Sequence, residues 1–339
     1  MARFLSMAAL TALFAFTAIT PTSAQTNTTV RINDYPGIGN PMARILVDEK
    51  LCEKHGITCT LQVIPSASLA VQALVGGSID VASAGADSGI LAASRGMKLK
   101  VLGNALADTN FFLAVGKHVD LDKAQAGYAP VMQRLRGKKI GVAARGSPAE
   151  YQFVALAQGA GMQRNDFTIV AVGGPDTAYP ALLHKQVDAL LAFEPIAAFC
   201  EVLDQCIVAV DMRKGQGPAD LIKLNGAAAP NFIRAEFAEQ NPAVVKALIT
   251  ALKEAESYYT DPAKWQTVVD ITAKRFPINN PNANAIIDRA LNSTKESVRF
   301  KLDPNALQAM ADFLFNTDQL SQPFDTTALL LDAGTGTIK

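Results

Sequence analysis

The feature that most constrains the fold is a regular alternation between short runs typical of β-strands and longer runs typical of helices. TTVRIND (28–34) is followed by PMARILVDEKLCEKH (41–55), with Asn40 as a candidate helix cap, and CTLQVIP (59–65) is followed by SLAVQALVGG (68–77). The short runs are rich in β-branched residues, and the longer runs place apolar residues at helical spacing. This alternation predicts an α/β fold built on mostly parallel sheets.

A second series of the same kind begins near FFLAVGK (111–117). Within the two series, GGSIDVASAGADS (76–88) and HKQVDALLAFEP (184–195) share a layout of helix end, Ile or Val followed by Asp, small apolar residues and polar turn. Either the chain contains a structural repeat, or the likeness follows from features common to all strand–helix units. From about Asn225 the pattern changes to helical runs, which predicts a helical C-terminal part packed on one lobe.

The first 24 residues have the composition of an export signal. Arg3 is their only charge, an apolar run spans residues 4–19, and small residues occupy 22–24. We therefore expect cleavage between Ala24 and Gln25 and an exported protein. A retained anchor is the alternative, but the apolar run is short for a membrane span of roughly 20 residues.

The composition of the chain argues against nucleic-acid binding and against a disordered protein. The chain has 31 Lys and Arg against 31 Asp and Glu, so no basic excess indicates nucleic-acid binding. Hydrophobic residues make up 49% and charged residues 18%, as in a well-cored globular protein. Its length after cleavage suits two domains or lobes.

The four cysteines form two local pairs, Cys52 with Cys59 and Cys200 with Cys206. In an oxidising compartment this spacing favours two disulfides over buried free thiols. There is no C-x-x-C motif, and the histidines do not cluster with the cysteines in sequence, so we expect no metal site.

Polar residues and glycines gather where predicted strands pass into helices. Open α/β sheets bind ligands at the carboxyl ends of their strands, where such joints meet. The joints are Asp34-Tyr35-Pro36-Gly37, Ser83 to Ser88, Arg145-Gly146-Ser147, Gly173-Gly174-Pro175 with Tyr179 one turn on, and Phe193-Glu194-Pro195.

The joint at Ser147 has two interpretations. Ser147 as cap, Pro148 as first helical residue and Glu150 as partner make a Ser-x-x-Glu capping box, which starts a helix without any ligand. The same helix start, with the N–H of Gly146 and the charge of Arg145, can also hold an anion.

Motifs for catalysis are scarce. Gly37-Ile38-Gly39 has Met42 where a dinucleotide-binding loop needs its third glycine, and the chain has no Walker loop, H-E-x-x-H or G-x-S-x-G. We therefore expect no catalytic residues and no cofactor, and a protein that is not an enzyme.

Taken together, LVGGSIDVASAG (74–85), LRGKKIGVAARGSPAEY (135–151), AGMQRNDFTIVAV (160–172) and QVDALLAFEP (186–195) resemble the periplasmic solute-binding proteins of ABC importers. The likeness is to the branch that serves sulfonates, taurine, nitrate and thiamine-precursor pyrimidines, and it covers about residues 28–200.

The resemblance implies a two-lobed fold, each lobe a mostly parallel sheet flanked by helices, with two hinge crossings and a helical C-terminal part. Lobe I would hold residues 25–112 and 228–339, and lobe II residues 113–227. A small-molecule ligand would lie between the lobes and favour the closed state. The implied protein is a monomer that serves an ABC permease; a membrane sensor is the alternative partner.

The joints and the resemblance together predict ligand contacts from both lobes and from the first crossing. The predicted ligand-binding residues are Asp34, Tyr35, Ser83, Gly85, Asp87, Ser88, Asn110, Phe111, Arg145, Gly146, Ser147, Gly174, Tyr179 and Glu194.

We expect the ligand to be a small organic anion, and an amine or a pyrimidine is the alternative. Arg145 and the helix start at Ser147 favour a carboxylate or sulfonate, and the aromatic residues allow a flat body. The acids of the joints favour an amine or a pyrimidine instead. Many relatives have Trp where this chain has Phe193, and its single Trp265 lies in the helical tail, which argues against a pyrimidine stacked on Trp.

A third alternative is an enzyme. Some proteins with this fold build the thiamine pyrimidine, and they carry a cysteine-rich iron motif. The scattered cysteine pairs and the export signal of this chain disfavour that activity.

Overall fold

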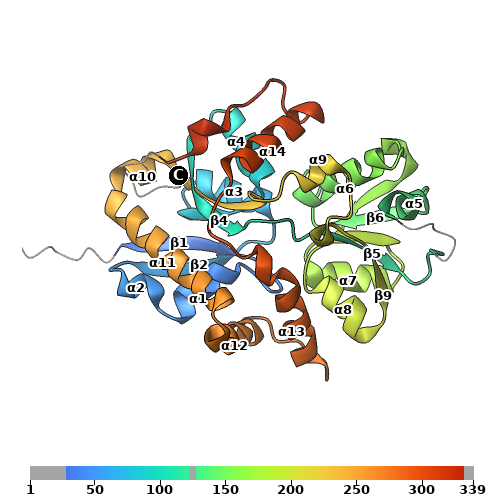
Figure 1. Ribbon diagram of the computed structural model, residues 1–339, viewed down its shortest axis with the longest axis horizontal. Helices are drawn as coiled ribbons and strands as arrows, with labels where there is room; N and C mark the ends of the chain where they lie inside the picture. Colours follow the sequence, from blue (N-terminus) through green and yellow to red (C-terminus); the bar gives the residue numbers. More distant parts are fainter. Residues whose placement is uncertain (1–27, 122–126, 332–339) are drawn as a thin grey trace, which may run out of the picture.

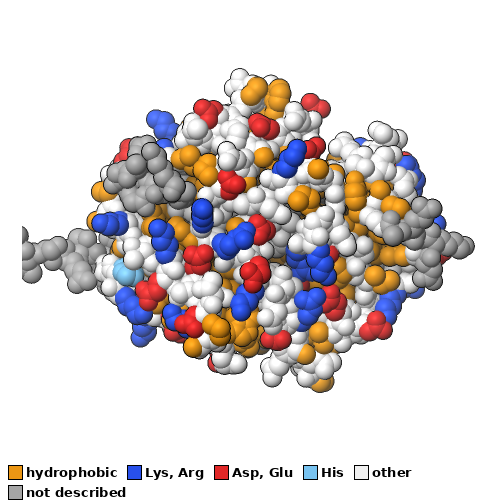
Figure 2. All heavy atoms as spheres, viewed as in Figure 1, with side chains coloured by type: hydrophobic (Ala, Val, Ile, Leu, Met, Phe, Trp, Pro, Cys, Tyr) orange, Lys and Arg blue, Asp and Glu red, His pale blue; other side chains and the backbone are white. Residues whose placement is uncertain are grey.

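The computed structural model describes residues 28–121 and 127–331 (Figure 1). The predicted export signal, with its cleavage point between Ala24 and Gln25, lies outside these residues. Of the helices that are described, none is both long enough and apolar enough to span a membrane. On the face in Figure 2, basic and acidic side chains are intermixed.

Two five-stranded sheets lie side by side, one in each lobe (Figure 1). The first has the order β2-β1-β3-β10-β4, with strands β1 (Thr29–Asp34), β2 (Thr58–Val63), β3 (Val81–Ser83), β4 (Leu99–Leu106) and β10 (Ala229–Arg234). The second has the order β7-β6-β8-β5-β9, with strands β5 (Phe112–Gly116), β6 (Lys139–Val142), β7 (Thr168–Ala171), β8 (Ala189–Ala192) and β9 (Cys206–Asp211).

Each sheet is mostly parallel and contains one reversed strand. β10 pairs antiparallel with β3 and β4, and β5 pairs antiparallel with β8 and β9, whereas β1 and β6 pair parallel with both of their neighbours. The reversed strands are the ones that the chain enters after crossing from the other lobe. The predicted two-lobed α/β fold is therefore confirmed.

The two lobes repeat one topology. Matching β1, β2, β3, β4 and β10 with β6, β7, β8, β9 and β5 makes the two strand orders identical. The aspartates that precede β3 and β8 also act alike: Asp80 accepts from the backbone N–H of Arg31 at 2.9 Å, and Asp188 from that of Lys139 at 2.8 Å. The structural repeat is real.

Helices cover the sheets, and the C-terminal ones return to the first lobe. The helices are α1 (Pro41–Asp48), α2 (Leu51–Lys54), α3 (Ala67–Val75), α4 (Ala86–Ser94), α5 (Tyr128–Gln133), α6 (Pro148–Gly159), α7 (Pro175–Leu183), α8 (Ile196–Leu203), α9 (Ala219–Ile222), α10 (Ala235–Gln240), α11 (Pro242–Thr260), α12 (Trp265–Arg275), α13 (Ala283–Thr294) and α14 (Pro304–Asn316). In the tail, α11 and α12 pack on α1, and α14 packs on α4.

The prediction that the helical tail packs on one lobe is wrong for α13. This helix contacts α12 on the first-lobe side and α8 of the second lobe, and it lies between the lobes in Figure 1. Sequence periodicity shows that a helix has an apolar face, but not that it has two such faces with different partners.

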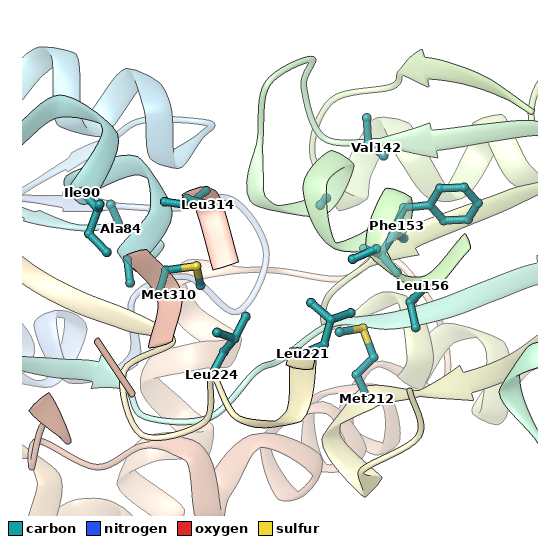
Figure 3. Close-up of a cluster of buried hydrophobic side chains, with 14 of the residues drawn as sticks. Ala84, Ile90, Val142, Phe153, Leu156, Met212, Leu221, Leu224, Met310 and Leu314 are labelled. Carbon is teal, nitrogen blue, oxygen red and sulfur yellow. The ribbon is translucent and has the colours of Figure 1, made fainter. Parts of the chain in front are cut away.

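One hydrophobic cluster runs from lobe to lobe (Figure 3). It extends from Ile90 in the first lobe through Leu224 and Leu221, in the second crossing, to Phe153 in the second lobe. The hydrophobic core is therefore continuous through the segment that connects the two lobes.

Both predicted disulfides are present. Cys52 and Cys59 join α2 to β2 with Cα atoms 5.8 Å apart, and Cys200 and Cys206 join α8 to β9 with Cα atoms 4.5 Å apart. Each bridge fixes a helix end to the next strand.

Candidate functional site

A cavity of about 150 Å³ lies between the lobes, at the carboxyl ends of the strands. Half of the predicted ligand-binding residues line it: Tyr35, Ser83, Gly85, Asp87, Asn110, Phe111 and Ser147. They come from the joints after β1 and β3, from the first crossing and from the start of α6.

The starts of α4 and α6 meet across this cavity. A methyl group added to Gly85, at the start of α4, would lie 2.9 Å from Cγ of Pro148, at the start of α6. That distance is shorter than carbon atoms tolerate, so the lobes close this far because residue 85 has no side chain.

Two of the predicted acids face a basic partner instead of the cavity. Asp34 is buried and pairs with Arg44 at 2.9 Å, and it also accepts the backbone N–H of Asn40 at 2.8 Å. Glu194 is buried and pairs with Arg213 at 2.6 Å. Both carboxylates hold the fold around the cavity.

Arg145 also lies away from the cavity lining. Its side chain is 56% exposed and pairs with Glu150 at 3.1 Å. The other predicted residues outside the lining have partners in their own lobe, as the backbone N–H of Ser88 donates to Asp87 at 2.7 Å and Tyr179 donates to Gln205 at 2.6 Å. Gly174 lines a separate small depression.

The capping box predicted at Ser147 is not formed. The Glu150 carboxylate accepts the N–H of Gly146 at 2.7 Å and pairs with Arg145 and with Arg164, at 3.0 Å from the latter. These partners hold Glu150 away from the N–H of residue 147, which the capping box requires. Arg164 comes from beyond the end of α6, so the motif alone could not reveal the competition.

The Ser147 hydroxyl also makes no cap bond, so it is available to a ligand. It lines the cavity, its residue is 3% exposed, and it has no hydrogen-bond partner among the described residues. Leaving a buried hydroxyl unpaired costs about 1–3 kcal/mol, which a ligand that bonds to it would recover.

Asp87 is the lining residue with the most unusual environment. It lies in the first turn of α4, is 3% exposed, and pairs with no Lys, Arg or His of the described chain. Burial raises the pKa of its carboxyl to about 6, against the lowering effect of hydrogen bonds from Ser88. The side chain therefore pays a desolvation cost that a hydrogen-bond donor or a cation in the cavity would relieve.

The cavity lining contains no Lys, Arg or His among the described residues. Its two charged members are Asp87 and Asp108, and Asp108 pairs with Arg299. The field inside the cavity therefore favours a cation over an anion, apart from the contribution of the two helix starts.

Aromatic rings form much of the wall. Phe111 and Phe193 meet edge to face with centroids 6.2 Å apart, and Tyr35 donates its hydroxyl to the carbonyl of Ser83 at 2.6 Å. The hydrogen bond to Ser83 holds the Tyr35 ring in place against the cavity. The lining therefore suits a flat, largely apolar body.

Several lining residues were not predicted. Asn40, expected only as a helix cap, makes no cap bond; its amide donates to Ser83 Oγ at 2.6 Å, and its Oδ1 has no partner among the residues described. Leu291 and Thr294 line the cavity from α13. Asn40 could have been predicted from its place at a strand–helix joint, as a polar residue before a proline. No sequence pattern predicts that α13 of the C-terminal part lines the cavity.

No group of three or more His, Cys, Asp or Glu that could hold a metal ion occurs in residues 28–121 and 127–331.

The sequence profile of the family described as NMT1/THI5 like matches residues 52–264. A protein of Brucella abortus, named as a candidate binding protein, is 28% identical over 291 residues, which are 85% of each chain.

Solved structures share the fold at low sequence identity. The alkanesulfonate-binding protein of Xanthomonas axonopodis pv. citri, bound to MOPS, superposes with a TM-score of 0.70 at 17% identity, covering 90% of this chain and 98% of that one. A desulfurization enzyme, DszB, superposes with a TM-score of 0.60 at 16% identity, covering 91% and 98%. The chain has the fold of the periplasmic binding proteins of ABC import systems, and the fold by itself does not separate binding from catalysis.

Proposed function

Because the chain belongs to the NMT1/THI5-like family, we propose that it is an exported, monomeric solute-binding protein without catalytic activity. It captures a small organic solute between its lobes and delivers it to an ABC permease. The closed cavity at the strand ends and the solute-binding proteins that share the fold support this function.

One observation carries the choice of ligand class: Asp87 is the predicted acid that reaches the cavity and has no basic partner among the described residues. A protonated amine, amidine or amino-substituted ring would donate to its carboxylate. Such a ligand restores to Asp87 the interactions that burial removed.

The cavity also limits the size and shape of the ligand. A cavity of about 150 Å³ in another protein binds benzene, so this one has room for a single ring in its closed form. The ring would lie among Tyr35, Phe111 and Phe193, and an acceptor atom on it would receive the Ser147 hydroxyl.

A carboxylate or sulfonate remains the second candidate. The unpaired hydroxyl of Ser147 at the start of α6 favours it, since helix starts attract anions. The placement of Arg145 outside the lining and the presence of Asp87 inside it weigh against this candidate. An anion would bind beside Asp87 only when that carboxyl is protonated.

Thermal unfolding with paired ligands tests the choice. Benzylamine and benzoate carry the same ring with opposite charge, and 4-aminopyrimidine, benzenesulfonate, taurine and nitrate extend the panel. A ligand at about 1,000 times its Kd adds roughly 4 kcal/mol of stability. We expect the amines to raise the midpoint of the wild type but not of Asp87→Asn.

Asp108→Asn is the matched control, because Asp108 lines the same cavity but pairs with Arg299. It should bind the amines as the wild type does. A midpoint raised by anions alone, and lost in Ser147→Ala, would overturn the assignment in favour of the second candidate.

Delivery to a permease has its own test. Cells that lack the chain should lose uptake of the bound solute. Unchanged uptake with loss of a solute-dependent transcriptional response would instead identify a membrane sensor as the partner.

A further inference from the structure

Helix α13 has two buried faces, each packed against a different lobe. Ile287 and Leu291 belong to the hydrophobic core of the first lobe, whereas Ile286 and Ala290 cluster with Ala198 of α8 in the second. Residues four apart lie on the same side of a helix, so the two pairs define two adjacent stripes. The helix therefore lies between the lobes as a shared element.

A buried polar contact lies at the end of the second-lobe face. The Ser293 Oγ lies 2.6 Å from Glu194 Oε1 and 2.8 Å from the carbonyl oxygen of Ala290, and it accepts from Nη1 of Arg213 at 3.0 Å. Its single proton favours the Glu194 carboxylate, because a charged acceptor makes the stronger hydrogen bond. Glu194 and Arg213 pair with each other at 2.6 Å, and Arg213 also pairs with Asp211 at 2.8 Å. Arg289 pairs with Glu201 farther along the same face.

The same helix reaches the ligand cavity. Leu291 and Thr294 line the cavity, and so does Phe193, which precedes Glu194 in the chain. Ser293 does not line it. The contact between Ser293 and Glu194 thus fixes two parts of the cavity wall, one from each side, without contacting the space where a ligand would lie.

The chain that follows α13 attaches it to the first lobe. The chain that follows the helix is hydrogen-bonded to β4 and its end, since Ala107 N–H donates to the carbonyl of Ser297 at 2.7 Å and Asn104 N–H to that of Phe300 at 2.8 Å. Opening of the lobes would therefore separate α13 from α8 and leave it on the first lobe.

That separation leaves no buried charge unpaired. Glu194 and Arg213 both belong to the second lobe and keep their ion pair when the Ser293 hydroxyl departs. The contact can therefore break and form again reversibly, which a cross-lobe ion pair with the same burial would resist.

We propose that α13 is a latch for the closed cleft and that Ser293 is a positioning residue for ligand capture. By bonding to the Glu194–Arg213 pair, Ser293 favours the closed state and thereby raises affinity without touching the ligand. The proposal rests on the proposed function, because capture requires closure.

Ser293→Ala tests the latch, with Asn292→Ala as its matched control on the exposed side of the same helix. Within the described part of the chain, the Asn292 side chain bonds to Asp288 of its own helix alone. We expect Ser293→Ala to lower the ratio of closed to open molecules about tenfold, because it removes bonds to charged groups. Asn292→Ala should leave the ratio unchanged.

Two readouts cover both regimes of the equilibrium. Small-angle X-ray scattering of the ligand-free protein reports the change when the closed state is abundant. The Kd for benzylamine reports it when the closed state is scarce, because apparent affinity then scales with the closed fraction. A variant that matches the wild type in both readouts would overturn the proposal.

The Arg289 and Glu201 pair supplies a second test that does not depend on Ser293. Arg289→Glu and Glu201→Arg should each lower the closed ratio by a factor of about two, and the double exchange should restore it. Absence of any effect in all three variants would also overturn the proposal. Scattering needs no ligand, so it tests the latch separately from the proposed ligand class. A negative result with every ligand of the panel would count against the proposed function and not against the latch.

Discussion

The two lobes place a buried acid at the same joint of the same topology, and the two acids differ in their partners. Asp87 follows β3 and Glu194 follows β8, and these strands hold corresponding positions in the two sheets. Glu194 pairs with Arg213, which it shares with Asp211, whereas Asp87 is buried with no basic partner among the described residues. In a repeated scaffold, one acid is thus paired within the protein, and the other is the one that we propose binds the ligand.

The largest expected effect comes from giving Glu194 the environment of Asp87. Arg213→Met leaves the Glu194 carboxylate buried without its partner, and breaking a buried pair in this way costs about 3–5 kcal/mol. Urea unfolding should show that loss of stability. Lys214→Met is the control, because Lys214 is exposed and contacts the same Asp211 only at the surface.

The converse change removes the unpaired acid. Burial raises the folded-state pKa of Asp87 from 3.8 to about 6. When the pKa of an acid is higher in the folded state than in the unfolded state, the protein loses stability as the pH rises from the unfolded-state pKa to the folded-state pKa. The loss persists at higher pH. Asp87→Asn should therefore stabilise the ligand-free protein at pH 7 by on the order of 3 kcal/mol, with no such gain below about pH 4.

Thermal unfolding of Asp87→Asn at several pH values checks this sign. A variant that is less stable than the wild type at pH 7 would show that the carboxylate stabilises the closed fold by itself. Asp87 would then resemble Glu194, and the comparison between the lobes would lose its meaning.

Ligand affinity should depend on the same titration. Benzylamine stays protonated from pH 5 to 8, so its affinity follows the ionisation of Asp87. We expect a constant Kd above about pH 7 and a weakening that approaches tenfold per unit below the free-state pKa of about 6. Calorimetric titration measures it, and a Kd independent of pH would contradict the assignment.

The smallest expected effect concerns Ser147. Replacing a capping Ser with Ala usually costs about 1 kcal/mol, but the Ser147 hydroxyl caps no N–H in this structure. Because the unpaired hydroxyl is buried, Ser147→Ala should not lower the stability of the ligand-free protein and should raise it by about 1 kcal/mol. A loss near 1 kcal/mol would mean that the hydroxyl serves the helix and is not available to a ligand.

The sequence predicted the lobes because their signals are local. Alternating runs specify strands and helices, and cysteines at short spacing specify bridges between adjacent elements. The likeness of residues 76–88 to residues 184–195 indicated a structural repeat, and the identical strand orders of the two sheets confirm it.

The partners of the acids could not be predicted in the same way. Arg44 reaches Asp34 from the next helix and Arg213 reaches Glu194 from beyond β9, and neither spacing forms a recognised motif. Glu150 pairs with Arg164 and does not form the capping box with Ser147. These nonlocal contacts decide which acid stays unpaired. For that reason our proposed ligand class differs from the anion that Arg145 and Ser147 favour in the sequence.

The measurement that tests the account most directly is a paired calorimetric titration of benzylamine and benzoate into the wild type and Asp87→Asn at pH 7.5. The account predicts that benzylamine binds the wild type, that benzoate does not, and that Asp87→Asn loses the benzylamine signal. Benzoate binding to both proteins, with no benzylamine binding to either, would contradict it.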